Sequence, residues 1–181
     1  MSSTDAHTAT SWPTPDRKTV PTVPDSERDS LESWLEYHRT TLLLKCAGLT
    51  PEQLVLRSCE PSTLSLLGIV RHMADVEAWL LDFEAAEYGP YYAFDDDRPG
   101  WNPHLDDLDP TTAEQDLANY YDAIRRARIA VADVDLDVLS PGDDGTRHSL
   151  RWIYQHMIEE YARHNGHADI LRERIDGVTG D

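Results

Sequence analysis

The feature that most constrains the fold of this chain is the stretch between Ser149 and Gly177, which reads as one long helix. Ser149 is a favourable residue at a helix N-terminus, and glycine is common just after a helix ends. One glycine and no proline interrupt the stretch, and its polar residues recur at helical spacing. The pattern predicts a single uninterrupted helix.

Three polar residues of this helix share one face. His156, Glu160 and His164 are separated by four residues each, so their side chains leave the helix one above the other. Imidazole and carboxylate groups at this spacing can converge on one ion, as paired histidines on a zinc-binding helix do. A further ligand must then come from another part of the chain.

Three more amphipathic segments precede this helix. We expect helices from Asp25–Ser26 to Gly48, from Ser62–Thr63 to about Glu84, and from Thr111–Thr112 onward. No segment alternates convincingly as a strand, so the fold class is all-α, a four-helix bundle with one long crossover connection. That connection, residues 85–110, holds five aromatic residues and is too long for a simple turn, which favours an ordered lid or pocket wall.

The chain is long enough for one domain with a full core. Residues 1–24 are rich in Ser, Thr, Asp and Pro, a composition typical of a disordered tail, and residues 25–181 form the predicted domain. With two cysteines, Cys46 and Cys59, and no CxxC motif, a thiolate zinc site is not expected.

Charge and hydropathy exclude several functions. A formal net charge of −18 argues against binding nucleic acid or anionic membranes, because both partners require a basic surface. The sequence contains neither an apolar run long enough to span a membrane nor a signal-peptide pattern. We therefore expect a cytoplasmic protein that acts on a small-molecule substrate.

The best candidate for the additional ligand is His72, on or beside the buried face of the second predicted helix. A histidine there needs a partner for its ring nitrogens, and a metal, a backbone carbonyl or a tyrosine could supply one. A buried Glu160 likewise needs a counter-charge. That charge could be a cation held with His72 and His164, or Arg163 in an ordinary salt bridge.

The segments LLGIVRHMADVE, around His72, and HMIEEYARHNGHAD, from His156 to Asp169, resemble the DinB/YfiT-like superfamily. They are most similar to its actinobacterial branch of small domains related to mycothiol-dependent enzymes, over roughly residues 26–177. The resemblance implies a four-helix bundle in up-down-down-up order, with zinc or nickel held between the second and fourth helices. It also implies dimerisation, which is common in the superfamily.

Carried over by position, the resemblance makes His72, Glu160 and His164 the metal ligands. Many members have histidine where this chain has Glu160, whereas the mycothiol-dependent maleylpyruvate isomerase resembles this chain in using glutamate. His156 and His167 are candidates for a fourth ligand or for supporting the others, and Asp169 for orienting a ligand histidine.

The implied activity is that of a thiol S-transferase or isomerase, in which the metal activates a low-molecular-weight thiol such as mycothiol as its thiolate. Two alternatives stay open. One is a non-catalytic, stress-related bundle that binds a metal or small ligand. The other is a metal-dependent hydrolase with Glu159 or His167 as general base.

For several other polar residues we expect a position at the surface or a simple ion pair. We expect the loop histidine His104 to face solvent, although it could close over the site, and Arg71 to be a surface charge or to hold polar groups of the thiol. Asp75 and Glu77 are expected to face solvent or to pair with Arg125 and Arg126.

Overall fold

The computed structural model describes residues 11–81, 83, 90–141 and 146–180. Within these ranges the regular secondary structure is helical, with one isolated β-bridge between Leu139 and Ser149, which confirms the all-α class. None of the helices formed by the described residues is long and apolar enough to cross a membrane.

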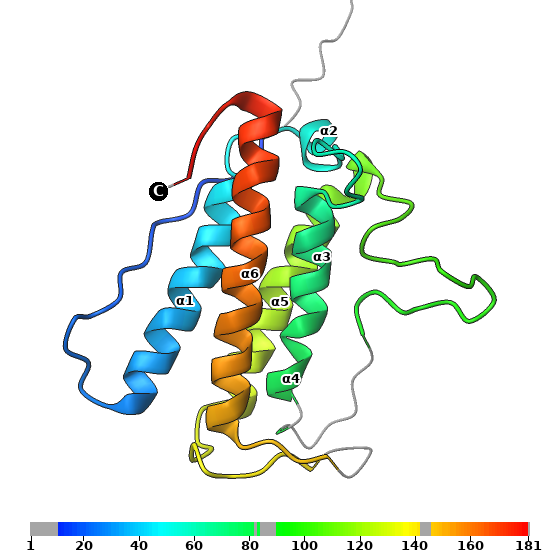
Figure 1. Ribbon diagram of the computed structural model, residues 1–181. Coiled ribbons are helices and arrows are strands. Elements are labelled where there is room, and N and C mark those ends of the chain that lie inside the picture. The colour runs from blue at the N-terminus through cyan, green and yellow to red at the C-terminus, as the bar shows by residue number, and fades with distance from the viewer. Residues whose placement is uncertain (1–10, 82, 84–89, 142–145, 181) are drawn as a thin grey trace, which may run out of the picture.

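The long helices α1, α3, α5 and α6 pack side by side (Figure 1). The most extensive contacts join α1 to α6 and α3 to α5. In the view of Figure 1, α1 and α6 run upward, whereas α3 and α5 run downward. The elements in chain order are α1 (Glu27–Cys46), α2 (Pro51–Leu54), α3 (Leu66–Val76), α4 (Ala78–Leu81), the 3₁₀ turn η1 (Pro110–Thr112), α5 (Ala113–Val131) and α6 (Leu150–Asp176).

The ends of α6 confirm the sequence prediction. The Ser149 hydroxyl accepts a hydrogen bond from the Trp152 N–H, and Gly177 ends the helix with a φ of 80°, a left-handed conformation that favours glycine. The start of α1 is also as predicted, with Ser26 as its N-cap.

The second predicted helix differs from the observed one in two ways. Its N-cap is Ser65 rather than Ser62 or Thr63, because the Ser65 hydroxyl accepts a hydrogen bond from the Gly68 N–H. The helix then divides at Glu77 into α3 and α4. Its predicted end at Glu84, like residues 85–89 of the connection, lies outside the described residues.

The described part of the N-terminal segment has no regular secondary structure, and its buried residue Trp12 joins it to the helices. Trp12 is buried, and its backbone N–H donates to the Leu49 carbonyl at 2.8 Å. The Trp12 carbonyl accepts from the Gly48 N–H at 2.9 Å. Residues 1–10 are outside the described ranges, and the boundary at residue 24 remains a prediction.

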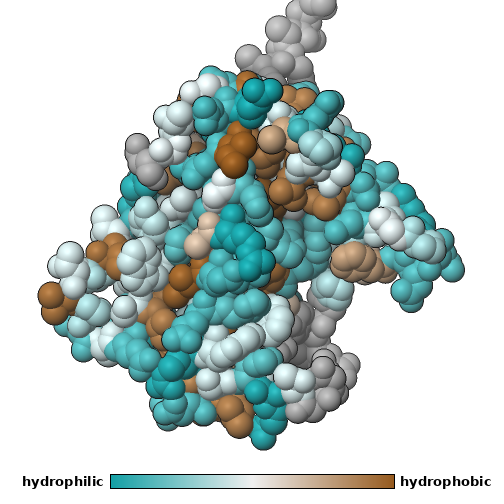
Figure 2. Space-filling view, viewed as in Figure 1, coloured by the Kyte–Doolittle hydropathy of each residue, from teal (hydrophilic) through white to brown (hydrophobic). Residues whose placement is uncertain are grey.

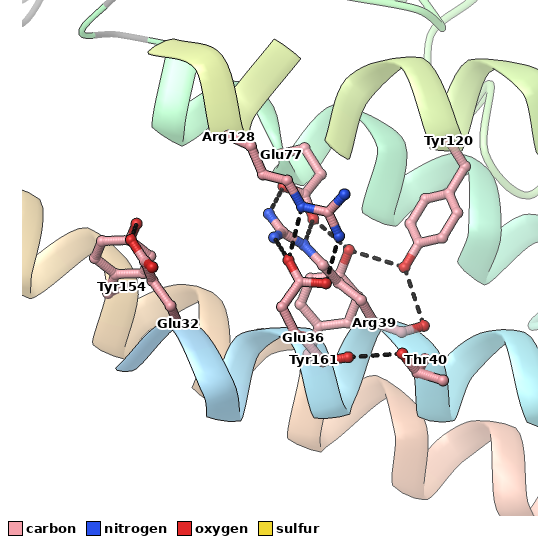
Figure 3. Close-up of polar contacts among 9 residues, drawn as sticks. All are labelled: Glu32, Glu36, Arg39, Thr40, Glu77, Tyr120, Arg128, Tyr154 and Tyr161. Atoms are coloured by element: carbon pink, nitrogen blue, oxygen red, sulfur yellow. Dashed lines mark hydrogen bonds and ion pairs between the residues drawn. The ribbon is translucent and has the colours of Figure 1, made fainter. Parts of the chain in front are cut away.

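A buried polar network joins the helices at mid-length (Figure 3). The Arg39 guanidinium of α1 donates two hydrogen bonds to the Glu77 carboxylate, which is fully buried at the end of α3. Tyr161 of α6 donates to Glu77 and lies 3.0 Å, oxygen to oxygen, from the hydroxyl of Tyr120 in α5. Side chains from α1, α5 and α6 and from the end of α3 therefore meet in this network.

This network corrects the expectation for Glu77, which neither faces solvent nor pairs with Arg125 or Arg126. Burial raises the pKa of the Tyr161 hydroxyl well above its ordinary value, and the negative charge of Glu77 raises it further. The hydroxyl therefore keeps its proton and can donate a hydrogen bond to the carboxylate.

Most of the surface seen in Figure 2 is hydrophilic, with apolar residues in separate patches.

Replacing Glu77 with alanine should be strongly destabilising. It leaves the Arg39 guanidinium buried without its main counter-charge, and breaking a buried ion pair costs about 3–5 kcal/mol. Urea denaturation measures the loss. Glu27→Ala, which removes an exposed partner of Arg151, is the matched control and should change stability far less. A Glu77→Ala free energy of unfolding equal to that of the control would contradict this role.

Candidate metal site

The helices α3 and α6 bring together the three residues predicted as metal ligands. The Nε2 atom of His164 lies 3.4 Å from Oε2 of Glu160, and the Nε2 atom of His72 lies 4.0 Å from the same oxygen. The imidazole rings of His72 and His164 are 4.7 Å apart between centroids. One potential ligand atom from each residue therefore lies within 4.8 Å of the other two.

Helical spacing accounts for this convergence. Glu160 and His164 are one turn apart on α6 and project toward α3, while His72 projects from α3 toward them. The side chains of Glu160 and His164 are 15% and 14% exposed, and that of His72 is 33% exposed. The cluster is thus shielded on its α6 side and more open at His72.

Both histidines are neutral near pH 7. Burial, together with a smaller effect of the nearby His104, lowers the pKa of His72 to about 4. Burial also lowers the pKa of His164 to about 4, with a smaller effect from His72. A neutral imidazole has a nitrogen lone pair available, which is the form that binds metals.

The donor set fits a divalent metal. Two neutral imidazoles and one carboxylate form a common catalytic zinc ligand set, and tetrahedral zinc at about 2.0–2.1 Å from its ligands places neighbouring donors about 3.3 Å apart. The two separations measured from Oε2 of Glu160, 3.4 and 4.0 Å, are close to that value, and the donors of His72 and His164 lie within 4.8 Å of each other. Glu160 has one competing partner, Arg163, at 3.5 Å from its Oε1 atom.

Of the additional α6 candidates, His156 forms a second group with Glu159 and Glu160, in which one potential ligand atom from each residue lies within 4.8 Å of the other two. His156 lies one turn before Glu160, with its Nδ1 atom 3.9 Å from a carboxylate oxygen of Glu159. The His167 ring contacts that of His164 edge-on at 5.4 Å between centroids. Asp169 pairs with Lys45 at 2.6 Å, so in this structure its partner is a lysine of α1.

The connection between α4 and η1 adds a further residue beside the cluster, His104. His104 is buried rather than solvent-facing, and its ring contacts that of His72 at 5.3 Å between centroids. Its Nε2 atom lies 2.9 Å from a carboxylate oxygen of Asp75. The expectation that Asp75 faces solvent or pairs with Arg125 or Arg126 is therefore wrong.

Arg71 is also not the surface charge that was expected. It is buried, and its guanidinium binds Asp116, Thr112 and the Pro103 carbonyl. That residues 85–110 form an ordered lid or pocket wall stays a prediction, and residues 85–89 lie outside the described residues. Spacing along the chain holds no information on which helix residues contact the rest of this connection.

One of three comparisons with known proteins found a match. A family model described as mycothiol-S-transferase matches residues 30–177, a range that includes His72, Glu160 and His164. No curated protein and no solved structure matches the chain.

The site geometry predicts opposite effects for two helix glycines. A Cβ atom at Gly68 would lie 2.7 Å from the His104 carbonyl oxygen, so Gly68→Ala should push the connection away and lower stability by about 1–3 kcal/mol. A Cβ atom at Gly166 meets open space within α6, so Gly166→Ala should raise stability by about 0.5–1 kcal/mol. Thermal denaturation measures both, and shifts in the same direction would contradict the close approach at Gly68.

Proposed function

This chain belongs to the mycothiol-S-transferase family, and we propose that it is a divalent-metal-dependent enzyme that activates a low-molecular-weight thiol at His72, Glu160 and His164. The observation that carries the proposal is the convergence of these three side chains from two helices that are far apart in sequence. Zinc or nickel is the proposed metal, and the reaction is an S-transfer or a thiol-dependent isomerisation.

The roles of the three residues follow from their chemistry. When bound, the metal would stabilise a thiol as its thiolate at neutral pH and leave a coordination position open for it. His72 and His164 supply neutral nitrogen donors, and Glu160 supplies one negative charge to offset the cation. Because burial already keeps both imidazoles neutral, they need not lose a proton before they bind a metal.

The order of the helices and the oligomeric state are also part of the proposal. The helix directions in Figure 1 support a four-helix bundle in up-down-down-up order, with α3 and α4 together as its second helix. A homodimer is also proposed, supported by exposed apolar residues such as Trp34 on α1 and Ile129 on α5.

Metal binding tests the ligand assignment. Protein purified without a histidine tag should bind one zinc or nickel ion per chain, and the bound ion should raise its melting temperature. His72→Ala and His164→Ala should each lower the affinity at least about 100-fold, since each removes one of three ligands. Elemental analysis measures the metal, and far-UV circular dichroism verifies that the variants are helical.

His148→Ala is the matched control, because His148 lies just before α6 and stacks on Trp152 rather than joining the cluster. It should keep the metal.

The metal-loaded wild type should then transfer mycothiol to a reactive electrophile and lose this activity when a chelator removes the metal. Failure of the wild type to bind either metal would contradict the proposed function.

A further inference from the structure

One face of α3 fastens the connection that follows α4. Gly68, Arg71 and Asp75 occupy positions three and four residues apart, so they lie along the same side of the helix. All three contact the segment between Tyr91 and Thr112, which covers this side of α3. His72 lies in the middle of the same helix, beside Arg71.

Asp75 fastens this segment at two distant points. One carboxylate oxygen accepts the Tyr91 backbone N–H at 2.7 Å, and the other lies 2.9 Å from the His104 Nε2 atom. A carboxylate can only accept hydrogen bonds, so Nε2 of His104 carries the hydrogen. The side chains of Asp75 and His104 are only 16% and 10% exposed, which shields their contact from competing water.

Arg71 and Gly68 support the same arrangement. Arg71 donates to the Pro103 carbonyl at 3.2 Å, directly before His104, and pairs with Asp116 at 3.0 Å. The absence of a side chain at Gly68 lets the His104 carbonyl approach α3 closely. Backbone and side chain of His104 are therefore both held against the helix that carries His72.

The consequence is an aromatic wall beside the candidate metal site. The His104 ring contacts His72 edge-on and in turn contacts Tyr92 and Phe94, at 5.9 and 5.7 Å between centroids. Its Nε2 atom is occupied by Asp75, so this nitrogen is not available as a metal ligand. A ring held in this way can shape the space next to His72 without joining the ligand set.

We propose that His104 forms a fixed wall of the thiol-transfer site and that Asp75 is the positioning residue that holds it there. The fastening of the connection by Asp75 stands independently, whereas the contact of His104 with a bound substrate rests on the proposed function.

Hydrogen exchange of the metal-free protein tests the fastening directly. Asp75→Ala should speed amide exchange at Tyr91 and at residues 104–106 at least about tenfold, because both hydrogen bonds to the connection are lost. Asp75→Asn should retain protection, since its amide oxygen can accept from Tyr91 and its amide nitrogen can donate to the other His104 tautomer. Amides in the middle of α1 serve as an internal reference.

Asp176→Ala is the matched control, because Asp176 also accepts one backbone N–H, from Val178, and one side-chain donor, Arg172, away from this segment. It should leave the exchange at Tyr91 and residues 104–106 unchanged. His104→Ala is a second variant, which removes the contact between His104 and Asp75 from the side of the connection. It should speed exchange at residues 104–106, and it tests the fastening if Asp75→Ala does not fold. Exchange as slow as in the wild type in the folded variants overturns the fastening.

The wall itself is tested on His104→Ala loaded with zinc. This variant should keep one zinc per chain and show a KM for the electrophile raised at least about tenfold, with a smaller change in kcat. Loss of zinc would make His104 a ligand and overturn its role as a wall, as would an unchanged KM. A wild type that binds no zinc refutes the proposed function and with it the wall, while the exchange result still decides the fastening.

Discussion

The arrangement of the whole structure depends on one buried ion pair, between Arg39 of α1 and Glu77 at the end of α3. Taking both charges out of water is costly, so the pair is retained only where its geometry and its further hydrogen bonds are complete. Tyr161 of α6 donates one such bond to Glu77, and the Tyr161 hydroxyl in turn lies 3.0 Å from that of Tyr120 in α5. Sliding any of these helices along its neighbours would leave a buried charge or hydroxyl without a partner. The network therefore favours one register of α1, α3, α5 and α6.

That register determines where the candidate ligands meet. Tyr161 directly follows Glu160 on α6, and Glu77 lies five residues after His72 on α3. The contact from Tyr161 to Glu77 and the approach of Glu160 to His72 therefore join the same two helices at neighbouring levels. The buried network thus sets the level at which the more open cluster of His72, Glu160 and His164 lies. Asp75 and Arg71 likewise use buried hydrogen bonds and ion pairs to hold the aromatic segment beside it.

The helices and the residues that share a helix face were predictable from the sequence. The pairings between residues far apart in the sequence were not. Periodicity and capping residues predicted α6 from Ser149 to Gly177, and the i, i+4 spacing predicted that Glu160 and His164 share a face. Its place on or beside the buried face of the second predicted helix singled out His72, and the resemblance to a known superfamily then implied that it is a ligand. By contrast, Glu77 is a charged residue whose partner Arg39 lies 38 positions earlier, and Asp75 is joined to His104 across 29 positions. Such pairs leave no periodic signal, so both acidic residues were expected at the surface.

The most direct test of the account is X-ray absorption at the zinc edge, measured on the loaded protein before and after mycothiol is added. The buried Cys46 and the half-buried Cys59 are not among the clustered residues, so the account predicts only nitrogen and oxygen neighbours, at about 2.0–2.1 Å, without the thiol. Mycothiol should then add one sulfur neighbour at about 2.3 Å. A spectrum that mycothiol leaves unchanged, or one with sulfur neighbours from the start, would contradict it.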